Sequence, residues 1–380
     1  MMSKRIIYLD NAASTSMSEA VIQHMSEIMR DIYGNPSSLH EFGRRARVLV
    51  EQSRRHIARM FGITPAELFF TSGGTEANNA VLWGACNAFS CSNVITSRLE
   101  HPAVLQCLEA LKQSMGITVH FVDVDELGHI RLDHLEELLK KYPSSLVSLM
   151  HANNETGNLL PVKSVALLCS QNNALFHSDT VQTVGKFAMD LDRSGIDFAV
   201  ASAHKFHGPK GAGFMYIRRG RLLNAFIKGG GQERNMRAGT ENIYGIAGMA
   251  KALEEAHQQL EEDRQYILSL KKECMVLLKK EVPGIRFWGD PEGNSLHSIL
   301  NIALCAGTNS EMLLPALDIE GICVSSGSAC ASGSLSGSHV LKALGADPAQ
   351  SSLRISFSRY NTSDEVTSFV EVIRKLSVRK

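Results

Sequence analysis

The segment of residues 69–78 could bind an anion. It reads FFTSGGTEAN, so an apolar run passes through the small residues Ser72-Gly73-Gly74-Thr75 into a stretch of helical character. Small residues let backbone N–H groups approach an anion, and the N-terminus of a helix attracts negative charge. The segment matches neither G-x-G-x-x-G nor G-x-x-x-x-G-K-[ST], which disfavours dinucleotide and nucleoside triphosphate binding.

Two further segments supply an acid and an amine. HSDTVQTVGK (177–186) places Asp179 at the end of an apolar run, with Gln182 three residues later, and SAHKFHGPKG (202–211) places Lys205 just past another such run. Taken singly, Asp179 is more simply a turn residue and Lys205 a solvated lysine. Taken together with an anion cradle, they are the three contributions that pyridoxal 5'-phosphate (PLP) requires: a phosphate site, an acid for the pyridine nitrogen and a lysine for a Schiff base.

Cys330 differs from the other cysteines in its surroundings. It lies in SSGSACASGS (325–334), a small and polar stretch that predicts an exposed loop. The chain has eight cysteines, without a C-x-x-C pair or a Cys/His cluster at zinc spacing, so neither a disulfide framework nor a zinc site is expected. The other seven lie among apolar or helical neighbours, and we expect buried thiols there. A thiol on an exposed arm suits a nucleophile that must carry its product outward.

These segments, in this order, resemble the cysteine desulfurases, a family with the aminotransferase class V fold among the fold-type I PLP enzymes. The resemblance runs from Tyr8-Leu9-Asp10-Asn11 to Leu353-Arg354-Ile355-Ser356. It is carried by TSGGTEANN, EHPAV, HANNETG, HSDTVQ, SAHKFHGPKG, GGGQERNMRAGTEN and SSGSAC. SSGSAC and Gly34-Asn35-Pro36-Ser37-Ser38 are similar to the NifS/IscS group of the family.

The resemblance implies the catalytic residues and the reaction. Lys205 would hold PLP covalently and move protons, His101 would stack on the ring and act as an acid–base group, and Cys330 would be the nucleophile. The implied reaction removes sulfur from L-cysteine, giving L-alanine and a persulfide on Cys330. A thiolate is required, and because no lysine or arginine lies in the immediate loop, His101 is our hypothesis for its proton partner.

The resemblance also implies binding residues, and no metal ligands. Asp179 would pair with the pyridinium, Gln182 would hydrogen-bond the phenolic oxygen, and Asn154 would lie close to it. The phosphate would be bound by Gly74, Thr75, Ser202, His204 and, from the other subunit of a homodimer, Thr240. Asn35 and Arg354 would bind the substrate carboxylate, for which a guanidinium fork is well shaped.

Simpler structural roles exist for several of these residues. His101 opens an expected helix and could merely cap it, and Arg354 could be an ordinary ion-pair partner. His204 could pack under the sheet, and residues 153–157 could be only a turn. It is the joint occurrence of the residues in family order that favours the functional roles.

Other functions on the same fold stay open. A selenocysteine lyase and a class V aminotransferase are the nearest alternatives, and an aminotransferase has no need of Cys330. A scaffold that binds PLP only for stability is the alternative from another class. The sulfur acceptor is not identified; iron–sulfur cluster assembly and tRNA thiolation are among the candidates. Members of this group often carry a longer C-terminal extension that docks an iron–sulfur scaffold protein, whereas this chain ends at Lys380, soon after its last expected helix, which argues against docking of that type.

We predict an α/β protein with the PLP-dependent transferase (aspartate aminotransferase-like) fold. A chain of 380 residues is too long for one ordinary core. We expect a large PLP-binding domain (16–255) with a mainly parallel seven-stranded sheet between helices, and a smaller α+β domain (1–15 and 256–380) that carries the cysteine loop. The expected strands of the large sheet are Glu67–Ser72, Asn93–Ser97, Ile117–Val122, Ser145–Met150, Ala174–Asp179, Phe198–Ser202 and Ala212–Ile217.

The rest of the chain predicts the smaller unit. Residues 244–281 predict one long helix, closed by Pro283-Gly284. Strands are expected at Ser298–Leu304 and Leu353–Ser358, and a helix at Asn309–Ile319. In the last helix Val366, Phe369, Val370 and Ile373 share one face.

Composition excludes several classes of partner. Lysine plus arginine number 39 and aspartate plus glutamate also number 39, so the formal net charge is zero, which favours neither a nucleic acid nor an anionic membrane as partner. The start of the chain does not resemble a secretory signal, and no apolar run approaches the roughly 20 residues of a membrane-spanning helix. We therefore expect a cytoplasmic protein.

Overall fold

The computed structural model describes residues 6–304, 310–326, 338–347 and 350–378. Its large sheet has seven strands in the spatial order β2-β8-β7-β6-β5-β3-β4. All seven coincide with the expected strands to within three residues: β2 (Leu68–Thr71), β3 (Asn93–Thr96), β4 (Thr118–Phe121), β5 (Leu146–Ser148), β6 (Leu175–Asp179), β7 (Phe198–Ser202) and β8 (Gly213–Ile217). Within the sheet β8 runs antiparallel to both neighbours and the other pairs are parallel. The predicted α/β fold with a mainly parallel sheet is confirmed.

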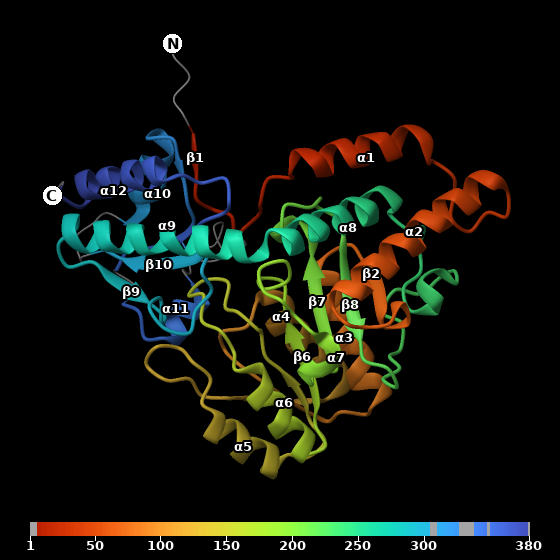
Figure 1. Ribbon diagram of the computed structural model, residues 1–380. Helices are drawn as coiled ribbons and strands as arrows, with labels where there is room; N and C mark the ends of the chain where they lie inside the picture. Colours follow the sequence, from red (N-terminus) through yellow and green to blue (C-terminus); the bar gives the residue numbers. More distant parts are fainter. Residues whose placement is uncertain (1–5, 305–309, 327–337, 348–349, 379–380) are drawn as a thin grey trace.

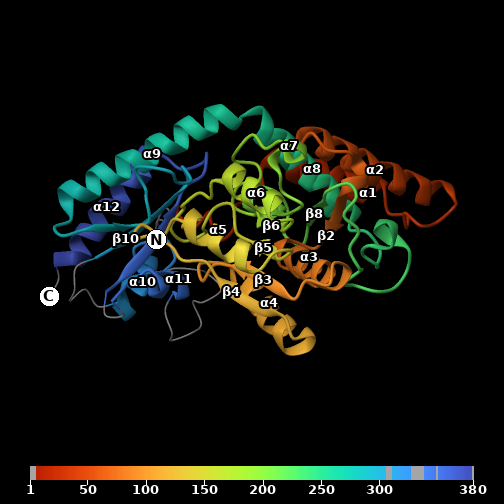
Figure 2. The same ribbon diagram turned by 90° about the horizontal axis from the view of Figure 1, so that it is seen from below.

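Both faces of this sheet are buried, which explains its nearly continuous apolar strands. Along β7, Phe198 and Val200 pack into one core while Ala199 and Ala201 pack into another. The first core is shared with α3 (Gly74–Ala88) and α4 (Pro102–Met115). The second core is shared with helices from the opposite side: α1 (Glu19–Asp31), α2 (Glu41–Met60), α5 (Leu132–Lys141), α6 (Val162–Gln171), the short α7 (Leu191–Ser194) and α8 (Ile243–Gln258). Figure 2 shows the sheet from below, with α3 and α4 on one side of it and α6 on the other.

A second unit is built around a smaller antiparallel sheet. In it β10 (Ile299–Ala303) lies between β12 (Ser352–Ser356) and β9 (Arg286–Trp288). Its helices are α9 (Leu260–Glu281), α10 (Ser310–Ile319), α11 (His339–Ala343) and α12 (Ser363–Val378). As predicted for one face of the last helix, Val366, Phe369, Val370 and Ile373 are all buried. Figure 1 shows this unit beside the large sheet. Helix α8 lies along the large sheet, and α9 continues from it along the small unit.

The beginning of the chain lies with its end. Strand β1 (Ile7–Tyr8) pairs in parallel with β11 (Ile322–Cys323), and Ile7 and Leu9 join the core formed by residues 267–373. This agrees in outline with a small domain made from both ends of the chain, but its boundaries at residues 15 and 256 stay a prediction.

The prediction of one helix over residues 244–281 was wrong. The structure has two helices, which meet at Gln259, where φ is −104° and ψ is 9°. Hydrogen bonds continue through the junction, from Gln259 N–H to Glu255 and from Asp263 N–H to Gln259. The two helices serve different cores, since α8 packs on α1 and α2 while α9 packs on α12. No proline or glycine marks such a break, so the sequence pattern cannot show it.

The cysteines follow the expectation with one correction. Cys86, Cys91, Cys107, Cys169 and Cys274 are buried, whereas Cys323 is partly exposed because it lies at the end of the two-stranded β1–β11 pair. Cys305 and Cys330 lie outside the described residues. Within the described part of the chain, no helix is long and apolar enough to cross a membrane.

Candidate active site

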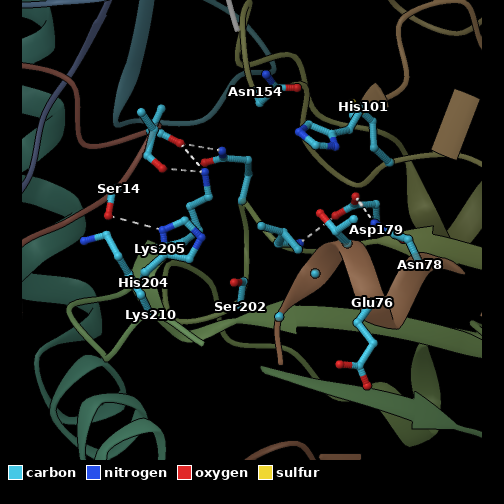
Figure 3. A pocket seen from close by; sticks show the side chains of 18 of the residues that line it. Ser14, Glu76, Asn78, His101, Asn154, Asp179, Ser202, His204, Lys205 and Lys210 are labelled. Carbon is cyan, nitrogen blue, oxygen red and sulfur yellow. Dashed lines mark hydrogen bonds between the residues drawn. The ribbon is translucent and has the colours of Figure 1, made fainter. Parts of the chain in front are cut away.

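A cavity of about 480 Å³ opens at the carboxyl ends of the parallel strands, which is where sites form in sheets of this type. Figure 3 shows side chains converging on it from several elements. Most of the residues singled out in the sequence line this cavity: Gly74, Thr75, His101, Asn154, Asp179, Gln182, Ser202, His204, Lys205 and Arg354. The fold therefore brings together positions that are up to 280 residues apart in the chain.

The acid of the site is Asp179, the last residue of β6, and it is 6% exposed. Its Oδ2 accepts a hydrogen bond of 2.7 Å from Nδ2 of Asn78, and its Oδ1 accepts one of 3.0 Å from the backbone N–H of Val181. Asn78 lies on α3 and is completely buried. One carboxylate oxygen is thus fixed from α3 and the other from the turn after β6, so the carboxylate has a defined orientation in the cavity.

The amine of the site is Lys205, which follows β7 in a short 3-10 turn (Ala203–Lys205). Its Nζ donates hydrogen bonds of 2.6 Å and 2.9 Å to the carbonyl oxygens of Ala12 and Ala13. Gln182 donates from Nε2 to the same Ala12 carbonyl at 3.0 Å, and its Oε1 accepts from Lys186 Nζ at 3.4 Å. The segment before α1 therefore forms one wall of the cavity, and it orients both the lysine and the glutamine.

The N-terminus of α3 forms a cradle for an anion. A Cβ atom at Gly74 would lie 2.6 Å from Cγ2 of Val181, so only glycine fits there. The first N–H groups of a helix have no hydrogen-bond partner within it. The first residues of α3 line the cavity together with Ser202, so their N–H groups and the Ser202 hydroxyl can bind an anion there. Glu76 is in the same helical turn, but Figure 3 shows its side chain directed away from Lys205. It pairs with Arg237 at 2.9 Å, so its charge is compensated.

His204 lines the cavity from the same 3-10 turn as Lys205. Its Nδ1 is 3.2 Å from the hydroxyl of Ser14. Burial, together with repulsion from Lys205 and Lys210, lowers the pKa of His204 to about 4. The imidazole is therefore neutral at pH 7 and serves the site as a hydrogen-bonding group.

His101 takes the structural role that the sequence allowed, and it also lines the cavity. It is the N-cap of α4, where its Nδ1 accepts a hydrogen bond of 3.1 Å from the N–H of Ala103. Because Nδ1 accepts, the proton of the neutral ring is on Nε2. Burial lowers the pKa of His101 below its ordinary value of 6.5; repulsion from Lys205 and His339 acts in the same direction, and attraction to Asp179 opposes it.

Arg354 likewise forms a structural contact and lines the cavity. Only 1% of it is exposed, yet it lines the cavity. Its Nη2 lies 2.8 Å from Oδ1 of Asp10, and its Nη1 donates to the carbonyl of Asn154 at 3.0 Å. Its Nε is buried and has no hydrogen-bond partner among the described residues. The ion pair that the sequence left open does form, and it fixes the guanidinium at the edge of the cavity.

Three predicted site residues are not brought to this cavity by the described chain. Asn35 is exposed between α1 and α2, where its Oδ1 accepts from the N–H of Ser37. Thr240 is exposed between β8 and α8. Cys330 lies outside the described residues. In the described ranges, no group of three or more His, Cys, Asp or Glu side chains could hold a metal ion.

Sequence reasoning missed several residues that shape the site. The sequence pattern assigns no role to Asn78, to Asp10 or to the stretch Ala12-Ala13-Ser14. Ala12 and Ala13 act through their backbone carbonyls, which no side-chain pattern can indicate. A polar residue one helical turn after a glycine-rich turn was the one available signal, and it points to Asn78.

A partly buried lysine, a fixed aspartate and a helix N-terminus at the carboxyl edge of a mainly parallel sheet are typical of the fold-type I class of PLP enzymes. Residues 7–369 match the family described as aminotransferase class-V. The chain is 42% identical over 373 residues to a cysteine desulfurase of Sinorhizobium fredii, covering 97% of this chain and 96% of the relative. It is 38% identical over 377 residues to "Cysteine desulfurase IscS" of Dictyoglomus turgidum, covering 98% and 95%.

A solved structure agrees. The fold matches a structure titled "NIFS-LIKE PROTEIN" with a TM-score of 0.90 and 37% identity, over 98% of this chain and 99% of the other. The chain belongs to the class V aminotransferase family and, within it, to the NifS/IscS-like cysteine desulfurases.

Proposed function

We propose that the cavity holds PLP on Lys205 and that Cys330 takes up the sulfur of L-cysteine as a persulfide. The observation that carries this proposal is the arrangement of Lys205, Asp179 and the α3 N-terminus around one cavity. A volume of about 480 Å³ suits a small cofactor together with an amino acid. The donor set suits PLP in particular, because it offers a primary amine, a fixed carboxylate and a helix N-terminus whose Gly74 packs closely against Val181.

Each side chain has an assigned part in binding the cofactor. Asp179, fixed by Asn78, pairs with the pyridinium nitrogen, while Gln182 and the nearby Asn154 face the phenolic oxygen. The phosphate is bound by the groups at the α3 N-terminus and at the end of β7, namely Gly74, Thr75, Ser202 and His204. Thr240 completes the phosphate site from the second subunit of a homodimer; its exposure in the single chain is what such a role requires.

The substrate is held through its carboxylate. Arg354 is the principal partner, because its guanidinium is already fixed by Asp10 and Asn154. Fixing a side chain before binding reduces the entropy that binding must overcome. A contact of Asn35 with the same carboxylate stays a prediction, because Asn35 does not line the cavity in the described chain.

Bound PLP supplies an electron sink that makes the sulfur of the substrate electrophilic. Lys205 moves the proton of the substrate Cα. The neutral His101 accepts the proton of the Cys330 thiol at Nδ1, whose lone pair then gives up the hydrogen bond from Ala103 N–H, and the thiolate attacks the substrate sulfur. The substrate C–S bond breaks as the new S–S bond forms, the carbon side takes up a proton, and L-alanine leaves. L-Cysteine and a thiol thus become L-alanine and a persulfide, with no other reductant or oxidant.

Covalent geometry supports the assignment of Cys330. It lies five residues after Ser325 and eight before Ser338. Ser325 is paired through its backbone with Arg354, at 2.7 Å from Arg354 N to Ser325 O, and Arg354 lines the cavity. Five residues span at most about 18 Å, so one end of the segment is tied to a residue of the site within a short reach of Cys330.

The persulfide sulfur passes to an acceptor. We propose that the acceptor belongs to a pathway such as iron–sulfur cluster assembly or tRNA thiolation. We also propose that the protein is a cytoplasmic homodimer. The zero formal net charge of the chain favours a protein acceptor over direct contact with nucleic acid.

The experiment is product analysis of protein reconstituted with PLP and incubated with L-cysteine and a thiol reductant. We expect L-alanine and sulfide in equal amounts, and neither product from Lys205→Ala. Cys323→Ala removes the partly exposed cysteine of β11 and serves as the matched control, with unchanged product formation. If Cys330→Ala still forms products from L-selenocysteine, a selenocysteine lyase is indicated. If Cys330→Ala transfers the amino group to a 2-oxo acid, an aminotransferase is indicated. A PLP-loaded wild type that makes no alanine indicates a scaffold.

A further inference from the structure

Helix α11 begins with two side chains that hydrogen-bond to residues next in sequence to the lining of the cavity. Ser338, eight residues after Cys330, is its N-cap and accepts a hydrogen bond of 3.0 Å from the N–H of Leu341. The same hydroxyl donates to Oε2 of Glu155. The next residue, His339, has its Nε2 2.9 Å from the carbonyl oxygen of Glu100. Both contacts cross from the small unit to the loops above the large sheet.

Each acceptor is one residue away from a residue of the site. Glu100 directly precedes His101, and Glu155 directly follows Asn154. Both acceptor residues are themselves held firmly. Glu155 is fully buried, and its backbone N–H donates to Oδ1 of Asn153 at 2.9 Å. Glu100 is 1% exposed, and its Oε1 accepts from the N–H of Met150 at 2.7 Å.

The chemistry of both contacts is directional. A carbonyl oxygen can only accept, so Nε2 of His339 must carry a proton, in the neutral as in the charged ring. A buried carboxylate is costly unless it is hydrogen-bonded, so the Ser338 hydroxyl stabilises Glu155 as well as the start of α11. The contact with Glu100 brings His339 to the residue directly before His101, and repulsion from His339 contributes to the lowered pKa of His101.

We propose that Ser338 and His339 are positioning residues that fix the C-terminal end of the cysteine-bearing segment at the site, beside His101. This inference rests on the proposed function, in which Cys330 is the nucleophile. Because Ser338 is fixed and lies eight residues after Cys330, Cys330 stays within about 28 Å of Ser338 even if the chain between them is extended. This limit raises the effective concentration of the Cys330 thiol at the substrate. The buried Val340 and Leu341 hold α11 in place. The two polar contacts join its start to the residues beside the site, and the Ser325–Arg354 pairing holds the other end of the segment.

The test is the single-turnover rate of persulfide formation on Cys330, measured by rapid quench with PLP-loaded protein and L-cysteine. We expect His339→Ala to lower this rate about tenfold and Ser338→Ala combined with His339→Ala to lower it further, because loose positioning of a reactive group costs one to two orders of magnitude. The PLP dissociation constant and the KM for L-cysteine stay near the wild-type values. His339→Gln, whose Nε2 can donate at a similar reach, restores much of the rate, and His339→Phe does not.

The control is His134→Ala, which removes a partly buried, hydrogen-bonded histidine of α5 that does not line the cavity. It should form the persulfide at the wild-type rate. Persulfide formation at the wild-type rate in the double variant overturns the inference, as does a parallel loss of PLP affinity or a His339→Gln protein no faster than His339→Phe. A PLP-loaded wild type that forms no persulfide on Cys330 overturns the proposed function as well.

Discussion

The guanidinium of Arg354 lies 2.8 Å from the carboxylate of Asp10, in an ion pair whose side chains are 2% and 17% exposed. Arg354 is on β12, near the end of the chain, and Asp10 follows β1 at its beginning. The pair thus joins the two ends of the chain at the edge of the cavity. The backbone of Arg354 also pairs with Ser325, which precedes the cysteine segment. One residue therefore connects the cavity, the small unit and the base of that segment.

Replacing Arg354 by lysine should weaken substrate binding. An ammonium is a point charge and cannot hold Asp10, the Asn154 carbonyl and a substrate carboxylate at once. We expect the KM for L-cysteine to rise at least about tenfold, which corresponds to the loss of one charged hydrogen bond. Steady-state kinetics at saturating PLP measure it. An Arg354→Lys enzyme with wild-type KM would show that the carboxylate binds elsewhere.

Replacing Asn78 by alanine should weaken PLP binding without destabilising the fold. Asn78 donates a 2.7 Å hydrogen bond to Asp179, and without it the carboxylate keeps only the Val181 N–H. We expect the dissociation constant of PLP to rise about tenfold, because hydrogen bonds to charged groups contribute about 1.5–3 kcal/mol. Fluorescence titration of the apoprotein measures it. Asn87→Ala, at an exposed position of the same helix, is the control, and equal affinities of the two variants would contradict the assigned role.

His101 should titrate below pH 6.5. Burial lowers its pKa, and repulsion from Lys205 and His339 adds to that effect. A lowered pKa keeps the ring neutral at pH 7, so it can accept a thiol proton, and this capacity is lost as the pH falls through the pKa. NMR titration of the histidine ring signals, with His101→Gln for assignment, gives the midpoint. His339→Gln should move the midpoint upward, and a wild-type midpoint above 6.5 would contradict the argument.

Thr240 should act across a dimer interface. In the described chain it is exposed and far enough from the cavity not to line it. We expect Thr240→Val to retain PLP less well on dilution. A mixed dimer of one Thr240→Val subunit and one Lys205→Ala subunit should then contain two different sites. One site combines an intact Lys205 with an intact Thr240 and retains PLP, and the other lacks both. Unchanged PLP retention in Thr240→Val would argue against a shared site.

The strands and the strand-end residues could be predicted because their signal is local. Apolar runs mark β6 and β7, and Asp179 and Lys205 come directly at or after their ends. The contacts that orient them could not be predicted, because they join distant parts of the chain: Asn78 and Asp179 are 101 residues apart, and Ser338 and Glu155 are 183 apart. The break at Gln259 also escaped, since it follows from two cores on either side rather than from any residue at the junction.

The most direct test of the account is mass spectrometry of PLP-loaded protein after incubation with L-cysteine in the absence of reductant. The account predicts a mass gain of one sulfur atom on the peptide that contains Cys330, with one L-alanine released per persulfide formed. Both should be lost in Cys330→Ala and kept in Cys323→Ala. Alanine release that persists in Cys330→Ala, or a sulfur adduct on another cysteine in the wild type, would contradict the central claim that Cys330 is the residue that accepts the sulfur.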